Sequence, residues 1–223
     1  MAPTRDILMK FYDAMAKAYG KQHWWPADNP FEVMVGAVLT QNTNWKNVEK
    51  AIENLKAAEV MDPFKLHALS QASLASLIKP AGYFNVKAKR LKNLLAWFCE
   101  QHDGSFEAIA QYHTYALQEA LVNIKGVGRE TADAIILYAF NKPTFVIDRY
   151  THRILTRHGL IDMEASYDDM KQLFEGCLPD DLALFNEFHA LIVQVGKNHC
   201  KPKAKCEGCP LEQFAHCVNP ESF

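Results

Sequence analysis

Apolar residues along this chain recur at intervals of three and four positions, the spacing of one face of an α-helix. Residues 114–124 show this spacing, and after a break residues 132–139 show it again. Residues 31–39 are almost wholly apolar, which indicates a helix buried on all sides. Strict alternation of apolar and polar residues, the pattern of a half-buried strand, is nowhere of useful length. The sequence therefore predicts an all-α fold.

A short glycine turn separates the two periodic segments. Gly126 and Gly128 flank Val127, so the backbone can turn tightly while the valine anchors the turn to the helices. The first N–H groups of the second helix have no partner within the helix, and together with Lys125 and Arg129 they would form a site for an anion such as phosphate. The alternative is a glycine-rich corner between two helices without a ligand, because G-x-G alone is weak evidence.

An aspartate follows the next apolar run. The letters FVI at residues 145–147 lead directly to Asp148, which stands twenty positions after Gly128. A carboxylate at this place has two interpretations. It is either the N-cap of a helix over residues 150–158 or an acid that carries chemistry.

Polar residues and tryptophans mark two further places where side chains are expected to reach a cleft. The buried helix stops at the polar letters QNTN, residues 41–44, which would be costly to bury, so Gln41 is a candidate contact with a substrate. Trp24 and Trp25 are adjacent and cannot both face one core, and Trp45 opens the next helix. Packing at a joint between elements is the alternative role for such tryptophans.

Positive charge gathers on one predicted helix, over residues 87–92. A solvated helix face is the commoner meaning of such a run. The expected exposed positions are Lys87, Lys89, Arg90 and Lys92.

The composition of the chain limits the classes of protein to which it can belong. With 223 residues, of which 49% are hydrophobic, the chain can fill one large core or two small ones. The net charge of −2 excludes a generally basic protein, so any surface that binds nucleic acid must be local. No segment has the pattern of a signal peptide or a membrane span, so a cytoplasmic protein is expected.

Four of the six cysteines form a C-terminal cluster with the spacing C-x5-C-x2-C-x7-C. In a reducing compartment they are expected to bind metal rather than to form disulfides. Zinc ribbons supply two C-x-x-C pairs and this segment has one, so the spacing favours a [4Fe–4S] cluster over zinc. If zinc is bound instead, His199 and His216 stand beside the cysteines as substitute ligands. The predicted ligands are Cys200, Cys206, Cys209 and Cys217.

The letters IKGVGRETADAI followed by VID, together with the C-terminal cysteines, resemble the helix-hairpin-helix DNA glycosylase superfamily, the endonuclease III-like proteins. The resemblance runs from about Phe31 to the cysteines. It implies two lobes: a helical barrel domain over residues 31–142 that contains the hairpin, and a second helical domain of residues 1–30 plus 143–223 that carries the cysteines. Asp148 would face the groove between them.

The resemblance also implies roles for individual residues. Asp148 would be the catalytic acid, and Gln41 would fill the gap left by an extruded base. The cysteines would hold a [4Fe–4S] cluster, although the family's usual spacing is x6, x2, x5. The DNA backbone would be held by Lys125, Gly126, Val127, Gly128 and Arg129.

Two departures from the superfamily narrow the expected activity. Members that also cleave the DNA strand have a lysine where this chain has Glu130, and a carboxylate cannot form a Schiff base. Adenine-specific members have a glutamate where this chain has Ala37. A monofunctional glycosylase is therefore expected, in which a fixed carboxylate stabilises the positive charge that develops on the sugar.

The expected substrate follows from the tryptophans. The letters WWP and AVLTQNT, together with the hairpin, resemble the 3-methyladenine DNA glycosylase III branch, in which Trp24, Trp25 and Trp45 match aromatic positions of the base pocket. An alkylated purine is cationic and is attracted to an aromatic face. We therefore expect a monomeric base excision repair enzyme for alkylated purines in double-stranded DNA, associated with the nucleoid through that DNA. The alternatives are a glycosylase for uracil or mismatched thymine, one whose lyase activity uses another lysine, and a DNA-binding protein that recognises damage without cleaving.

Overall fold

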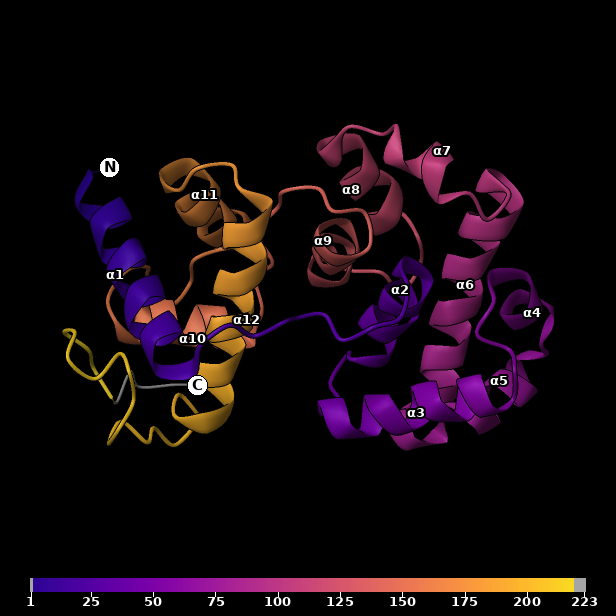
Figure 1. The fold of residues 1–223 in the computed structure, drawn as a ribbon, viewed down its shortest axis with the longest axis horizontal. Helices are drawn as coiled ribbons and strands as arrows, with labels where there is room; N and C mark the ends of the chain where they lie inside the picture. The colour runs from indigo at the N-terminus through magenta and orange to yellow at the C-terminus, as the bar shows by residue number, and fades with distance from the viewer. Residues whose placement is uncertain (1, 219–223) are drawn as a thin grey trace. The chain divides into compact units, whose positions relative to one another are not determined.

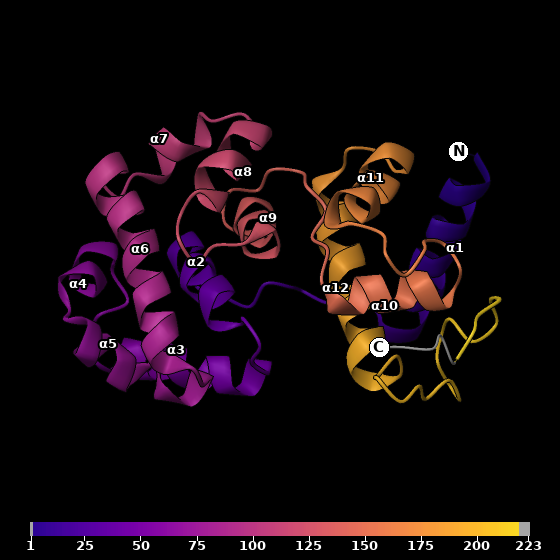
Figure 2. The same cartoon turned by 180° about the vertical axis from the view of Figure 1, so that it is seen from behind.

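The computed structural model describes residues 2–218, and within them every regular element is a helix, so the prediction of an all-α fold is confirmed. The chain divides into two compact units. One unit is Trp25–Lys142, and the other combines Met1–Trp24 with Pro143–Phe223 (Figures 1 and 2).

The unit over residues 25–142 is built around α2 (Pro30–Leu39), whose residues 31–39 are all buried. Asn29 caps this helix by accepting a hydrogen bond from the Glu32 N–H at 3.0 Å, and Pro30 occupies its first position. Helices α3, α6 and α9 pack against α2. The other elements of the unit are α3 (Trp45–Ala57), α4 (Pro63–Ala68), α5 (Gln71–Leu77), the 3₁₀ helix η1 (Lys79–Ala81), α6 (Phe84–His102), α7 (Phe106–Ala110), α8 (Thr114–Val122) and α9 (Arg129–Tyr138).

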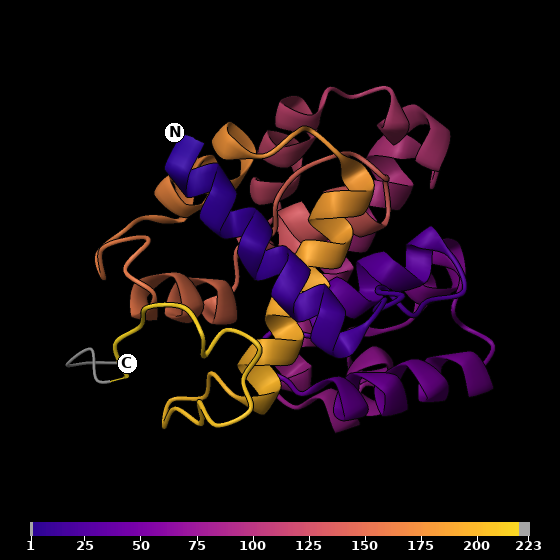
Figure 3. The same ribbon diagram turned by 60° about the vertical axis from the view of Figure 1, so that its left-hand side comes forward.

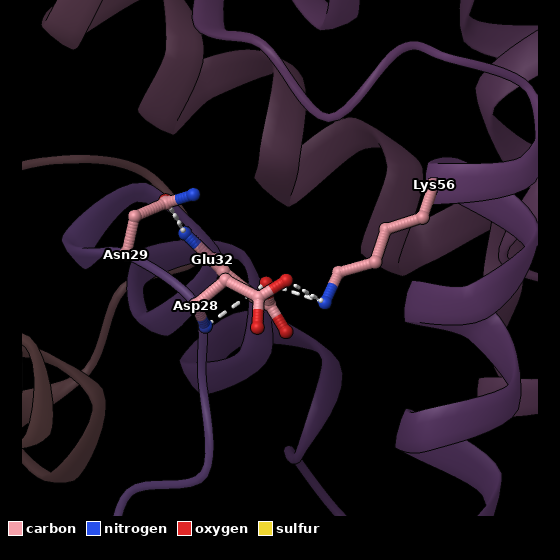
Figure 4. A network of polar contacts seen from close by, with 4 residues as sticks. All are labelled: Asp28, Asn29, Glu32 and Lys56. Carbon is pink, nitrogen blue, oxygen red and sulfur yellow. Dashed lines mark hydrogen bonds and ion pairs between the residues drawn. The ribbon is translucent and has the colours of Figure 1, made fainter.

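A charged network ties α3 to the start of α2 (Figure 4). The ammonium of Lys56 lies 2.8 Å from a carboxylate oxygen of the buried Glu32 and 2.7 Å from one of Asp28. The Glu32 carboxylate stands in the first turn of α2, where the helix dipole favours negative charge. Because its charge is also paired, this carboxylate can be buried between two helices.

The second unit contains α1 (Ala2–Tyr19), α10 (Arg149–Arg157), α11 (Tyr167–Cys177) and α12 (Leu182–Asn198). Helix α12 packs against both α1 and α10. A Cβ atom at Gly196 would lie 2.2 Å from the Tyr150 ring, so the glycine is what lets that ring lie directly against the α12 backbone. The rings of Phe145 and Phe174 stack at 3.7 Å in the core. Residues 199–218 follow α12 as a loop without helix or strand.

Lys87 contradicts the expectation of a solvated positive face on α6. Its side chain is buried, and its ammonium donates hydrogen bonds to the carbonyl oxygens of Leu39 and Ala81, each at 2.7 Å, and to the Thr43 hydroxyl. Of the four cations only Lys89 is exposed, whereas Arg90 and Lys92 are half-buried. The prediction is wrong for Lys87 because a long side chain can reach carbonyl groups at the end of α2 and in η1, which spacing along α6 does not show.

Lys87→Met should reveal a pH-dependent contribution to stability. Burial, aided by the charge of Arg90, lowers the pKa of Lys87 from 10.5 to about 8. Between these values the unfolded chain holds the proton and the folded protein has released it, so the contribution of Lys87 to stability rises with pH in this window. We expect the free energy of unfolding of the wild type, relative to Lys87→Met, to increase from pH 7 to pH 10 in chemical denaturation.

The exposed Lys89 on the same helix provides the control for this measurement. Lys89→Met removes the same charge from an exposed position of the same helix, so its stability curve is the baseline against which that of Lys87→Met is compared. Stability curves of wild type and Lys87→Met that run parallel from pH 7 to pH 10 would contradict the assigned pKa.

Candidate functional site

The predicted hairpin is present as α8, a turn and α9. Gly126 has a φ of +104°, and a Cβ atom there would lie 2.3 Å from Cγ of Arg90, so this position requires glycine. Val127 is buried and anchors the turn, whereas Lys125, Gly128 and Arg129 are exposed. Gly128 is the N-cap of α9 and has open space where a side chain would be. The N-terminus of α9 is therefore accessible and is flanked by two cations, an arrangement suited to phosphate.

Gln41 lies against this hairpin. Its amide nitrogen donates to the Gly126 carbonyl at 3.1 Å and to the Thr131 hydroxyl at 3.0 Å, and Arg90 donates to its amide oxygen. Asn93 of α6 donates to the Lys125 carbonyl at 2.7 Å. The loop after α2 and two side chains of α6 thus brace the hairpin, a role of Gln41 that its position in the sequence did not indicate.

The structure brings two of the three predicted tryptophans together. The rings of Trp25 and Trp45 meet edge to face, with centroids 5.4 Å apart. The Trp25 ring also contacts the Tyr138 ring, with centroids 5.4 Å apart. Gly36 of α2 leaves room for Trp25, because a Cβ atom there would lie 3.2 Å from the indole. Trp24 belongs to the other unit, where the ammonium of Lys197 lies 5.7 Å from its ring centroid. Tyr138 was not among the expected site residues, although its place at the end of the second periodic segment was a signal.

Asp148 is the N-cap of α10. Its Oδ1 accepts hydrogen bonds from the Thr151 N–H at 2.7 Å and from the Thr151 hydroxyl at 2.9 Å, and the Asp148 side chain is 11% exposed. The other oxygen, Oδ2, lies 4.0 Å from Nε2 of the buried His189 on α12. The capping role offered as an alternative for Asp148 is therefore present, and it involves only one of the two oxygens. His189 was not among the site residues expected from the sequence.

The loop that carries the predicted metal ligands, residues 199–218, follows directly on the C-terminal end of α12 (Figure 3). Cys200, Cys206 and Cys209 line one cavity, together with Arg157, His158, His199 and His216. Burial raises the pKa values of the Cys206 and Cys209 thiols, and the nearby cysteines raise them further. The exposed Cys217 is held by its backbone N–H, which donates to the Arg157 carbonyl at 2.7 Å. Within residues 2–218 the side chains of His, Cys, Asp and Glu do not form a group of three or more arranged to hold a metal ion.

Helix α10 anchors the cysteine loop through two buried arginines. The Arg157 guanidinium lies 3.2 Å from the Cys200 sulfur and donates to the carbonyls of Lys201 at 2.7 Å and Pro202 at 2.8 Å. Arg153 donates to the Cys200 carbonyl at 2.6 Å. The helix that begins at Asp148 therefore ends as the attachment point of the predicted ligand loop.

The hairpin of α8 and α9 and the accessible N-terminus of α9 fit the class of helix-hairpin-helix DNA repair proteins that the sequence resembles. Residues 35–180 match the profile of the HhH-GPD superfamily base excision DNA repair proteins, and the chain belongs to this family. The resemblance seen in the sequence is confirmed. The protein is a DNA glycosylase of base excision repair that binds DNA.

Three comparisons show the range of its relatives. A DNA repair glycosylase of Methanocaldococcus jannaschii is 45% identical over 94% of this chain and 96% of its own length. Endonuclease III of Thermotoga maritima is 30% identical over 85% of this chain and 83% of its own length. The solved structure of the Helicobacter pylori 3-methyladenine DNA glycosylase MagIII bound to 1,N6-ethenoadenine is 33% identical, with a TM-score of 0.76 over 87% of this chain and 97% of that one.

Within residues 2–218, helices long and apolar enough to cross a membrane are absent.

Proposed function

We propose that this glycosylase removes alkylated purines of the 3-methyladenine type from duplex DNA, as a monofunctional enzyme and a monomer. The observation that carries the proposal is the aromatic cluster of Trp25, Trp45 and Tyr138. An electron-rich ring face binds a cationic purine more strongly than a neutral base. The similarity to a 3-methyladenine glycosylase solved with a modified adenine supports the same class of substrate.

Asp148 is the proposed catalytic residue. Thr151 holds Oδ1 with two hydrogen bonds, which leaves Oδ2 to face the positive charge that develops on the deoxyribose as the base departs. The same carboxylate can orient or deprotonate the attacking water. An alkylated base is already a good leaving group, so the reaction does not require a separate acid.

A Schiff-base step is not part of the proposal. Glu130 occupies the first turn of α9 and is exposed, and the helix dipole accounts for an acidic residue there. Trapping with borohydride on damaged duplex should therefore give no covalent enzyme–DNA product. A trapped product would favour the endonuclease III type of reaction with another lysine as nucleophile.

The hairpin supplies the proposed DNA contact. The N–H groups at the start of α9, with Lys125 and Arg129, would bind a backbone phosphate of any sequence. Gln41 would fill the gap left by the extruded base, for which it must release its hydrogen bonds to Gly126 and Thr131. Binding by the hairpin and entry of Gln41 into the duplex are thus proposed to be linked.

Gly128→Asp should weaken binding to every duplex by at least about tenfold, or roughly 1.4 kcal/mol. The new carboxylate would stand against the phosphate, while the open space at this position lets the variant fold. Fluorescence anisotropy at several salt concentrations would measure the affinity, and Gly128→Ala is the matched control. Unchanged affinity of Gly128→Asp, or wild-type binding that does not fall with salt, would contradict a phosphate contact at this hairpin.

We also propose that Cys200, Cys206, Cys209 and Cys217 hold a [4Fe–4S] cluster. Four thiols are the donor set that such a cluster takes, three of them line one cavity, and the Arg157 guanidinium beside the Cys200 sulfur would offset the negative charge of the thiolates. The cluster would supply no chemistry to base removal; it would fasten the C-terminal loop to α10. Zinc is the alternative occupant, since His199 and His216 line the same cavity.

The test of the proposed substrate is a panel of damaged DNAs offered to the wild type and to tryptophan variants. Trp25→Ala and Trp45→Ala should each slow release of 3-methyladenine from methylated DNA by about 5- to 150-fold, the range that corresponds to roughly 1–3 kcal/mol of stacking per base. Trp→Phe should be milder, because a weaker aromatic face remains. Chromatography of the released bases measures the effect, and binding to abasic duplex should change less.

Trp24→Ala is tested in the same series, and its melting temperature is measured together with its excision activity. Lys197 already lies over the Trp24 ring, so a loss of excision that accompanies a lower melting temperature would assign this ring a supporting role. Wild-type protein that removes uracil or mismatched thymine and leaves 3-methyladenine in place would contradict the proposed substrate and leave the assignment as a glycosylase unchanged.

A further inference from the structure

We propose that His189 is a positioning residue that fixes the orientation of the Asp148 carboxylate. The inference rests on the proposed catalytic role of Asp148. His189 is 6% exposed on α12, and its Nε2 lies 4.0 Å from Oδ2 of Asp148. Oδ1 is held by Thr151, and a carboxylate held at one oxygen can still rotate about that point. A second contact, at Oδ2, defines the plane of the group.

The separation of 4.0 Å is longer than a hydrogen bond. Hydrogen bonds of catalytic groups are often long in the free enzyme and tighten when substrate is bound. A shift of about 1 Å would bring Nε2 within the 2.7–3.2 Å range of N–H···O bonds. His189 can therefore donate to Oδ2 in the complex with DNA while Thr151 continues to hold Oδ1.

The packing of α12 fixes where His189 stands. The backbone of α12 contacts the Tyr150 ring directly at Gly196, and Tyr150 is the second residue of α10, two positions after Asp148. The histidine and the aspartate thus lie on two helices whose separation is set by close packing. A residue that orients another must itself be held in place, since a small misplacement of a catalytic group lowers the reaction rate strongly.

The surroundings of His189 favour the neutral imidazole. Burial lowers the pKa of His189, the negative charge of Asp148 opposes that shift, and the positive charge of Lys197 adds to it. A protonated histidine would cancel the negative charge that the sugar cation requires. A neutral imidazole with its proton on Nε2 orients the carboxylate and leaves that charge in place.

The experiment compares His189→Leu, which removes the donor and keeps most of the volume, with His189→Gln, whose side-chain amide can donate from nearly the same place. Release of 3-methyladenine from methylated duplex is measured under single-turnover conditions. Affinity is measured on a duplex with a tetrahydrofuran abasic analogue, and stability by thermal melting. We expect His189→Leu to slow release by about 10- to 100-fold with affinity nearly unchanged, and His189→Gln to restore most of the rate.

A double-mutant cycle with Asp148→Asn separates this inference from the proposed function. If His189 acts through Asp148, the double variant Asp148→Asn with His189→Leu should be no slower than Asp148→Asn alone. A wild-type rate for His189→Leu, while Asp148→Asn releases the base slowly, would overturn the role of His189 and leave that of Asp148. Equal losses of rate and melting temperature in the Leu and Gln variants would also overturn it, in favour of packing. A wild-type rate for Asp148→Asn would overturn the proposed catalytic acid itself.

Discussion

Asp148→Asn should slow base release severely while the variant still binds damaged duplex. We expect a loss of at least about 100-fold in single-turnover rate, since an amide can neither stabilise the sugar cation nor accept a proton from water. The substitution tests the charge alone. Asparagine is as good an N-cap as aspartate, and its carbonyl oxygen can accept the hydrogen bonds that Thr151 donates to Oδ1.

Glu130→Ala is the matched control for this experiment. Glu130 lies in the first turn of α9 and is exposed. Its removal should change excision only slightly, with at most a small loss in helix stability. Equal losses of excision in the two variants would mean that the acid has been assigned to the wrong residue.

Cys206→Ser should release the proposed cluster and destabilise the unit that contains α10 and α12. Wild-type protein purified without oxygen is expected to contain iron and inorganic sulfide and to absorb broadly in the visible range, whereas the variant should lack these. Because the binding energy of a structural metal centre is folding energy, the melting temperature should fall by several degrees. The rate of base release per folded molecule should change much less.

Cys99→Ala provides the comparison for Cys206→Ser. Cys99 is buried on α6 in the other unit, so its replacement should leave the iron content unchanged. Stoichiometric zinc without iron in the wild type would contradict the cluster and assign the loop to zinc, with His199 or His216 as a ligand in place of one cysteine.

The sequence by itself determined those features that depend on neighbours along the chain. Residues 31–39 form a fully buried helix because almost every one is apolar, and the letters GVG join two helices because Gly126 can adopt a positive φ. Asp148 caps α10 because a short polar side chain beside a helix start can bond the Thr151 N–H. The all-α fold followed from these local patterns and the family from the resemblance of its motif letters, and both are confirmed.

Only the tertiary structure decided which distant side chains meet. Lys87 was expected in solvent on a charged helix face and is instead buried against the carbonyl of Leu39, forty-eight positions away. Trp25 meets Trp45 and Tyr138, and Oδ2 of Asp148 faces His189 on another helix. Periodicity shows which face of one helix is buried, but the partner across that face is chosen by how whole helices pack, with glycines such as Gly196 setting the approach. Chemistry that needs two side chains at a defined distance therefore cannot be derived from spacing along the chain.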